Sequence, residues 1–228
     1  MKKTFGIIGN PIKHSLSPVL HNYWFNKYDI EATYSILNTG ENDLKDVVNK
    51  IKNKELNGLN ITLPYKQKIV SYLDILVNDA EITSSVNTVY LDDNNIVVGE
   101  NTDVFGLQAA YLKEVDDISN KKALIIGAGG VSPSVILSLQ KSGVKSVTIV
   151  NRTLEKCIFL KKKFNNLIIL KWDNIREKIK DFDIIINATS LGLKGGEDFD
   201  FNFAKTKSSL IYIDTIYNPL ETKTLKYL

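Results

Sequence analysis

Short runs of β-branched and aliphatic residues alternate along the chain with segments whose apolar residues recur at helical spacing. The short runs are typical of buried strands, and the helical spacing is typical of helices that bury one face. Their alternation predicts βαβ units, and therefore an α/β fold built on parallel strands.

In the first half, a helix is expected to begin at Ser17-Pro18, with Ser17 as the capping hydroxyl and proline in the first turn. Asp92-Asp93-Asn94-Asn95 predicts a hairpin turn. The expected strands are 5–8, 33–37, 59–63 (stopped by Pro64), 88–91 and 96–99. The expected apolar helix faces are Val19, Leu20, Tyr23, Trp24 and Tyr28, then Leu44, Val47, Val48 and Ile51.

The second half begins near Asp103 with a connecting helix, which places a domain junction near residues 100–106. The expected helices are 104–113, 131–140, 154–164 and one that begins at 222. The expected strands are 122–127, 146–150, 167–170, 183–187 and 210–214. We therefore expect two domains, residues 1–103 and 104–228.

The composition is that of an ordinary globular protein, with 228 residues, 43% hydrophobic and 24% charged. The net charge of +3, from 29 Lys+Arg against 26 Asp+Glu, is too small to indicate a nucleic-acid partner. A single cysteine, Cys157, excludes an internal disulfide and fits a reducing compartment. Because no signal-peptide pattern or membrane-spanning run is present, we expect a cytoplasmic protein with no membrane partner.

A dinucleotide-binding turn is indicated where one strand passes into a helix, at Gly127-Ala128-Gly129-Gly130-Val131-Ser132. Gly127 would permit the tight turn, and Gly129 would let the backbone approach a pyrophosphate at the helix N-terminus. Ser132 stands at the third glycine position, and Pro133 falls in the first helical turn. An ordinary glycine turn is the alternative.

The end of the next strand indicates which dinucleotide would bind. NAD enzymes usually place an acid there for the ribose 2′-hydroxyl, whereas this chain has Asn151-Arg152-Thr153. A guanidinium can pair with a 2′-phosphate, so NADP is favoured. Lys156 would add positive charge or is an ordinary surface lysine, and Glu155 is the nearby acid that would weaken the pairing. Thr189 and Ser190, after a later strand, would contact the cofactor or form a simple turn.

Three polar clusters in the first half lie at expected strand or helix ends. Ser15 and Ser17 are two residues apart, so both hydroxyls would face one way in an extended segment, unless Ser17 only caps the helix. The other clusters are Asn60, Thr62 and Lys66, then Asn87-Thr88 with Asn101-Thr102-Asp103. Lys66 and Asp103 would suit proton transfer in a ketone reduction, although a solvated lysine and a helix-capping aspartate are the alternatives.

Taken in order, these motifs resemble the shikimate dehydrogenase family across nearly the whole chain. The matching segments are 9–12, 14–18, 60–66, 86–88, 101–103, 127–130, 151–153, 187–190 and 214–217. The resemblance implies an N-terminal α/β substrate domain, a Rossmann-type domain, and NADPH-dependent reduction of 3-dehydroshikimate to shikimate in aromatic amino-acid biosynthesis. It implies no metal, a small-molecule substrate, and a monomer or homodimer.

The resemblance also implies a role for each matched residue. Lys66 and Asp103 would be catalytic. The substrate-binding residues would be Ser15, Ser17, Asn60, Thr62, Asn87, Asp103 and Tyr217. The cofactor-binding residues would be Gly127, Ala128, Gly129, Gly130, Val131, Asn151, Arg152, Thr153, Lys156, Thr189 and Thr215.

The match departs from the family after Leu228, where family members continue with a Gly-rich loop and a helix that returns to the first domain. That segment carries a glycine near the nicotinamide and a substrate glutamine. The resemblance therefore implies a shortened form or a loss of part of the site, with an apolar surface of the first domain uncovered. The alternatives are a quinate/shikimate dehydrogenase that uses NAD and a shikimate-binding relative without catalysis.

Overall fold

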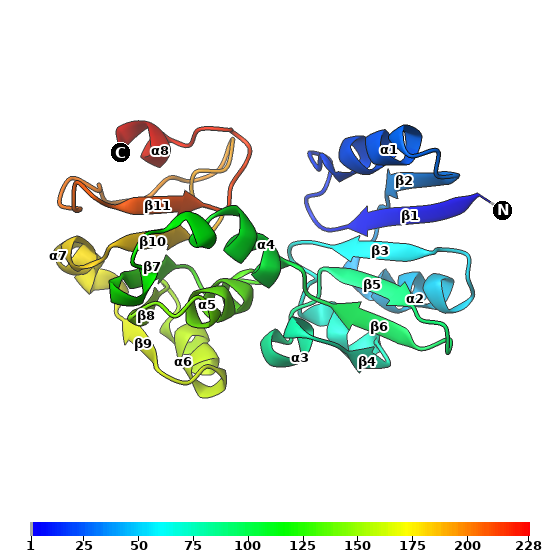
Figure 1. Ribbon diagram of the computed structural model, residues 1–228, viewed down its shortest axis with the longest axis horizontal. Coiled ribbons are helices and arrows are strands. Elements are labelled where there is room, and N and C mark those ends of the chain that lie inside the picture. The colour runs from blue at the N-terminus through cyan, green and yellow to red at the C-terminus, as the bar shows by residue number, and fades with distance from the viewer. Residues whose placement is uncertain (1) are drawn as a thin grey trace. The chain divides into compact units, whose positions relative to one another are not determined.

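The computed structural model describes residues 2–228, which divide into two compact units, residues 2–102 and Asp103–Leu228 (Figure 1). Each unit contains one β-sheet with helices packed against it, so the predicted α/β class is confirmed. No helix in the described part of the chain is both long and apolar enough to cross a membrane.

The first unit is built on a mixed sheet with the strand order β2-β1-β3-β5-β6-β4. Its strands are β1 Lys3–Ile8, β2 Ala32–Ile36, β3 Gly58–Ile61, β4 Ile75–Leu76, β5 Thr88–Leu91 and β6 Val97–Glu100. Strand β1 pairs in parallel with β2 and β3, as the alternating pattern predicts, whereas β5 runs antiparallel to both β3 and β6. Strand β4 was missed because two residues are too few to show a period.

The helices of this unit are α1 Ser17–Lys27, α2 Leu44–Lys52 and α3 Asp79–Thr83. The predicted apolar face of α2 is confirmed, because Leu44, Val47, Val48 and Ile51 are all buried. These residues join the main core cluster of the unit, which also contains Ile8, Leu59, Ile61, Val89 and Val97 from the sheet. Burial of this face on the sheet is what stabilises α2.

The predicted apolar face of α1 is wrong. Val19, Leu20, Tyr23, Trp24 and Tyr28 are exposed, with exposed fractions between 38% for Trp24 and 70% for Val19. A different face meets the sheet, and it contains His21, Asn22 and Phe25. The Asn22 amide exchanges hydrogen bonds with the backbone of Tyr34 in β2, at 2.8 Å and 3.0 Å. This amide pairing with an edge strand orients the helix, and hydropathy alone cannot detect it.

The expected cap at Ser17 is also wrong. The residue that precedes the helix is Leu16, and Ser17 is the first helical residue, followed by proline as predicted. The Ser17 side chain instead hydrogen-bonds with Tyr34.

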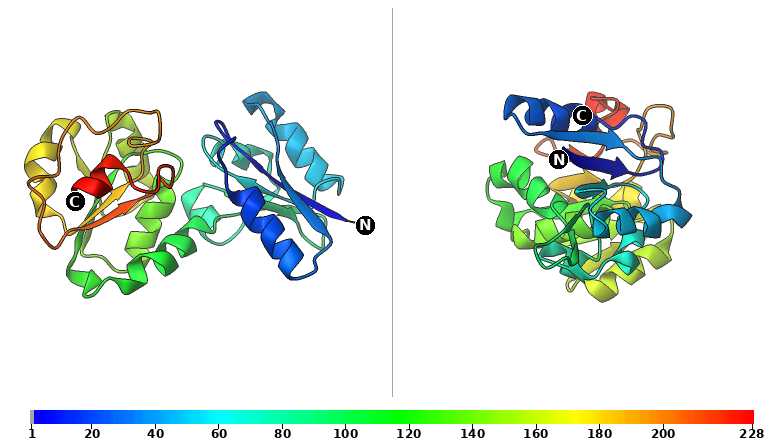
Figure 2. Two further views of the ribbon diagram at one scale, coloured as in Figure 1. Left: turned by 90° about the horizontal axis from the view of Figure 1, so that it is seen from above. Right: turned by 90° about the vertical axis from the view of Figure 1, so that its right-hand side faces the viewer.

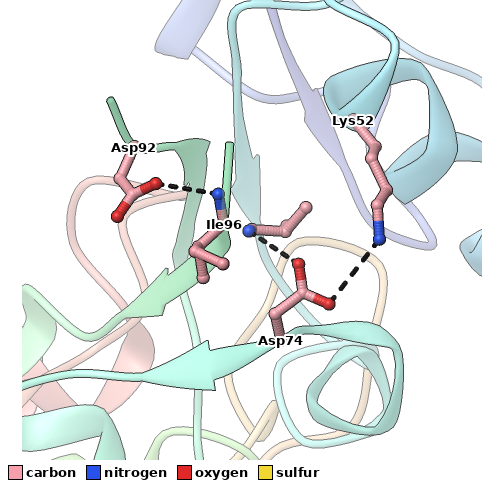
Figure 3. A network of polar contacts seen from close by, with 5 residues as sticks. Lys52, Asp74, Asp92 and Ile96 are labelled. Atoms are coloured by element: carbon pink, nitrogen blue, oxygen red, sulfur yellow. Dashed lines mark hydrogen bonds and ion pairs between the residues drawn. The ribbon is translucent and has the colours of Figure 1, made fainter. Parts of the chain in front are cut away.

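The β5–β6 hairpin is confirmed, and its turn is held by the Asp92 carboxylate (Figure 3). The Asp92 Oδ1 atom accepts hydrogen bonds from the backbone N–H groups of Asn94, at 2.9 Å, and Ile96, at 2.8 Å. Asn95 adopts a φ of 59°, in the left-handed region that asparagine tolerates. Below the turn, Asp74 accepts a hydrogen bond from the Val97 N–H and lies 3.8 Å from the Lys52 ammonium.

The second unit contains a fully parallel sheet with the strand order β11-β10-β7-β8-β9. Its strands are β7 Lys122–Ile126, β8 Ser146–Val150, β9 Leu167–Leu170, β10 Ile184–Asn187 and β11 Ile211–Asp214. Its helices are α4 Asp103–Ala110, α5 Ser132–Lys141, α6 Leu154–Lys163, α7 Ile175–Lys178 and α8 Lys223–Tyr227. Short 3₁₀ helices across the two units cover 41–43, 68–72, 112–114, 118–120, 172–174 and 179–181.

Helices cover both faces of this sheet, and each face has its own core (Figure 2). One core combines Val104 of α4, Val135 of α5 and Leu160 of α6 with alternate residues of the strands. The other combines Ile175 of α7 and Phe203 with the remaining strand residues. Burial on both faces explains why these strands are continuous apolar runs in the sequence.

Candidate active site

The turn between β7 and α5 requires glycine at Gly127. Its φ is 112°, and a Cβ atom there would lie 2.7 Å from both the Ala188 carbonyl oxygen and the Thr189 methyl. At Gly129 the nearest atom to a Cβ would be 3.9 Å away. The buried Ser132 hydroxyl donates to the Gly127 carbonyl at 3.0 Å, so the residue at the third glycine position stabilises the turn by a hydrogen bond across it.

Asn151, at the end of β8, joins this turn to the next loop. Its Oδ1 atom accepts a hydrogen bond from the Ala128 N–H at 3.2 Å, and its Nδ2 atom donates to the Thr153 carbonyl at 3.0 Å. The side chain therefore holds two neighbouring loops at the carboxyl edge of the sheet, where α/β proteins bind ligands.

Arg152 lies exposed beside this edge, between an aromatic ring and a carboxylate. The guanidinium carbon lies 5.6 Å from the centre of the Trp172 ring, and Nη1 lies 3.2 Å from Oε2 of Glu197. Glu155 was expected to be the acid that weakens an anion site here, but the acid that pairs with Arg152 is Glu197. Thr153 and Lys156 are exposed, with Thr153 directly before α6.

Polar residues after β10 and β11 form a third loop cluster. The Thr189 hydroxyl donates to Asn187 Oδ1 at 2.7 Å and accepts from the Leu191 N–H at 2.9 Å. These bonds stabilise a local turn. The Thr215 hydroxyl donates to the Asn187 carbonyl at 2.8 Å, and Asp214 accepts from the Asn187 amide at 3.0 Å. Asn187 therefore joins the two strand ends.

In the first unit, Asn60 is the centre of a polar network. The Tyr34 hydroxyl donates to Asn60 Oδ1 at 2.7 Å. Asn60 Nδ2 donates to the Asn87 carbonyl at 3.1 Å and to the Thr88 hydroxyl at 3.2 Å. The Asn87 side chain in turn bonds to Thr102, whose N–H donates to Asn87 Oδ1 at 3.0 Å. Two of the predicted substrate residues, Asn60 and Asn87, are thus brought together.

The predicted serine pair lies at the start of α1. Ser15 and Ser17 are both partly buried, and the Ser17 N–H lies 3.3 Å from the Ser15 hydroxyl oxygen. Burial raises the pKa of the Tyr34 hydroxyl, and the hydrogen bond with Ser17 opposes that rise. Tyr34 therefore connects the serine pair to the Asn60 network.

The other predicted residues lie on loops or at element ends. Thr62 and Lys66 follow β3, and the Lys66 carbonyl accepts the Val86 N–H at 2.8 Å. Asp103 opens α4 at the start of the second unit. Tyr217 follows β11 in the second unit and is 56% exposed.

Three residues that contact predicted site residues, Tyr34, Trp172 and Glu197, were not predicted from the sequence. Trp172 follows β9 at the same carboxyl edge as the other loops, so the strand-end rule applied to β8 could have found it. Tyr34 lies within a strand and Glu197 within a loop, and neither position carries a local signal.

These features define a class of protein. A parallel five-stranded sheet with a glycine turn at its carboxyl edge is a Rossmann-type dinucleotide-binding unit, and here it follows a smaller α/β unit that carries a polar network.

Comparison with known proteins identifies the family. Residues 7–89 match the shikimate dehydrogenase substrate binding domain, and residues 109–216 match the shikimate / quinate 5-dehydrogenase family. The shikimate dehydrogenase (NADP(+)) of Pelagibacter ubique is 48% identical over 99% of this chain and 83% of its own length. The Bacillus subtilis enzyme of the same name is 36% identical over 99% of this chain and 82% of its own. The chain belongs to the shikimate dehydrogenase family, as the ordered motifs predicted.

Solved structures of this family share the fold of this chain. Shikimate dehydrogenase from Aquifex aeolicus superposes with a TM-score of 0.90 at 35% identity, over 99% of this chain and 82% of that one. The Thermus thermophilus enzyme, solved in complex with NADP(H) and shikimate, superposes with a TM-score of 0.86 at 28% identity, over 98% and 82%.

Proposed function

We propose that this chain is an NADP-dependent shikimate dehydrogenase, which reduces 3-dehydroshikimate to shikimate in aromatic amino-acid biosynthesis. The observation that carries the proposal is the 48% identity, over 99% of the chain, to a relative named shikimate dehydrogenase (NADP(+)). Residues 1–103 would form the substrate-binding and catalytic domain, and residues 104–228 the NADP-binding domain.

The second unit fits the cofactor. The tight turn at Gly127 packs against Ala188 and leads into the N-terminus of α5, and a Cβ at Gly129, where the backbone would approach a pyrophosphate, would be 3.9 Å from its nearest neighbour. The proposed pyrophosphate residues are Gly127, Ala128, Gly129, Gly130 and Val131. Asn151, Arg152, Thr153 and Lys156 would hold the adenosine phosphate, and Thr189 and Thr215 would lie along the cofactor. When bound, the reduced nicotinamide supplies the hydride.

The polar groups of the first unit fit a substrate with one carboxylate and several hydroxyls. Ser15 and Ser17 are proposed to bind the carboxylate. Thr62, Asn87 and Asp103 are proposed to bind the ring hydroxyls, with Asn60 beside them and Tyr217 as a further contact. Asn60 uses both amide hydrogens within the protein, so its main contribution would be to orient Asn87 and Thr88.

The reaction also needs a proton on the ketone oxygen as the hydride reaches the carbon. The Lys66 ammonium is proposed to deliver or stabilise that proton, and the Asp103 carboxylate to orient Lys66. Both residues would serve the proton transfer, Lys66 directly and Asp103 through Lys66, so loss of either should lower turnover more than it lowers cofactor binding.

The test is NADPH oxidation with 3-dehydroshikimate, comparing the unchanged chain with Lys66→Ala. We expect the substitution to lower kcat by about 10²- to 10⁴-fold, the usual contribution of a general acid, while NADPH binding is retained. Lys68→Ala is the matched control, because Lys68 is an exposed lysine two residues away that pairs with Glu41. Equal activity of the two variants would remove Lys66 from the mechanism.

Three further points are proposals. Quinate with NAD is the competing substrate and cofactor pair, and initial rates with each combination separate the two activities. The cytoplasm is the proposed compartment, supported by the single cysteine, Cys157, whose side chain is buried. A monomer or homodimer is the proposed state, which light scattering would decide.

A further inference from the structure

Arg152 is held on two sides by its own unit. Trp172 lies against the guanidinium and is itself fixed by an edge-to-face contact with Phe201, at 5.9 Å between ring centres. Glu197 accepts a hydrogen bond from Nη1 at 3.2 Å. Both partners of this ion pair are well exposed, 53% for the arginine side chain and 76% for the glutamate, so an incoming ligand can reach either of them.

The position of Glu197 is set by the loop that carries it. The Gly192 N–H donates to the Glu197 carbonyl at 2.7 Å, which closes the loop between these residues. Gly192 and Gly195 take φ values of 96° and 80°, conformations that suit glycine. The Lys194 N–H donates to the Asn218 carbonyl at 3.0 Å and ties the loop to the segment after β11.

A carboxylate and a phosphate make the same demand on a guanidinium, because each accepts its N–H donors in the plane of the group. A 2′-phosphate that binds Arg152 must therefore displace Glu197 from Nη1 or lie beside its negative charge. A cofactor that has only a hydroxyl at this position leaves the ion pair intact.

From this geometry we infer that Glu197 is a specificity-determining residue, which competes with the 2′-phosphate of NADP for Arg152 and so narrows the preference for NADP over NAD. The inference rests on the proposed role of Arg152 in the cofactor site. The Glu197 carboxylate is an anion of the protein itself, and it weakens binding of the cofactor that carries a 2′-phosphate without weakening binding of the one that lacks it.

The experiment uses two ligands that probe the adenosine end alone. Adenosine 2′,5′-bisphosphate carries the 2′-phosphate, and adenosine 5′-monophosphate lacks it. Their dissociation constants are measured by titration calorimetry for the unchanged chain and for Glu197→Gln. The control is Asp198→Asn, which makes the same change of charge at the next residue, where the carboxylate pairs with Lys223.

We expect Glu197→Gln to bind the bisphosphate about 1.5- to fivefold more tightly, the range that corresponds to breaking one exposed ion pair. Binding of the monophosphate should stay the same, and Asp198→Asn should bind both ligands like the unchanged chain. The preference for NADP over NAD, as the ratio of kcat/KM values, should rise by the same factor in Glu197→Gln.

The inference is overturned if Glu197→Gln leaves the bisphosphate constant unchanged or weakens it. It is also overturned if Asp198→Asn gives the same gain, since general electrostatics would then account for the effect. Arg152→Gln tests the proposed function separately. If that variant binds the bisphosphate as tightly as the unchanged chain does, Arg152 is not the phosphate ligand, and both assignments fail together.

Discussion

Replacing Gly127 with alanine tests the turn on which the cofactor assignment depends. An alanine at a φ of 112° costs about 1–2 kcal/mol in backbone conformation. Its methyl group would also lie 2.7 Å from the Ala188 carbonyl oxygen, a backbone atom that cannot rotate away. Overpacking of this kind costs about 1–3 kcal/mol, and the stiffer unfolded chain offsets about 0.4–1 kcal/mol. The net loss should be about 1–4.5 kcal/mol.

Differential scanning calorimetry measures this loss, which corresponds to a drop in Tm of roughly 4–18 °C for a unit the size of the second one, at about 4 °C per kcal/mol. Gly129→Ala is the matched control, since a Cβ there would be 3.9 Å from its nearest neighbour. It should stay within about 0.5 kcal/mol of the unchanged chain. If the two variants melt at the same temperature, close packing of the turn against Ala188 is not what selects glycine at this position.

Two further predictions concern groups away from the glycine turn. Tyr34→Phe leaves Asn60 Oδ1 without the hydroxyl that donates to it, so we expect the free energy of unfolding to fall by about 1 kcal/mol. We also expect a higher KM for 3-dehydroshikimate and an unchanged KM for NADPH. Equal effects on both KM values would contradict a role on the substrate side. Burial raises the pKa of the Cys157 thiol to about 11, so a disulfide reagent should label it only on unfolding, and rapid labelling of native protein would refute its burial. Because the native thiol keeps its proton while an unfolded one ionises near its ordinary value of 9.0, stability should fall as the pH rises from about 9 to about 11 in urea titrations.

Hydrophobic periodicity predicted the elements whose stability comes from burial. Helix α2 and the parallel strands of the second unit lie where the pattern placed them, since each buries its apolar residues on a sheet. The apolar residues of α1 misled because Trp24 and Tyr28 stack on each other with the Lys27 ammonium against them, while Asn22 makes the contact with β2. Hydropathy ranks Asn22 as a surface residue, so a hydropathy pattern cannot predict that Asn22 pairs with the backbone of β2.

The site was predictable where spacing along one strand end fixes the neighbours. Gly127 and Arg152 fall at the ends of adjacent parallel strands, so their loops meet at one edge of the sheet. The contact of Arg152 with Glu197 spans 45 positions of sequence and depends on the shape of a loop. The hydrogen bond from Tyr34 to Asn60 likewise depends on two strands that both pair with β1. Contacts of this kind require the folded chain.

The neighbouring residues Asn151 and Arg152 differ in what they contribute: Asn151 stabilises the loops, and Arg152 presents a charged group at the surface. Asn151 is half-buried and ties the glycine turn to the loop after β8, whereas Arg152 projects from that loop into solvent. With the role proposed for Arg152, a substitution there would change which coenzyme binds while the hydrogen bonds of Asn151 stay intact. The coenzyme preference proposed for this chain would then be open to change through single surface substitutions, without loss of the turn that holds the coenzyme.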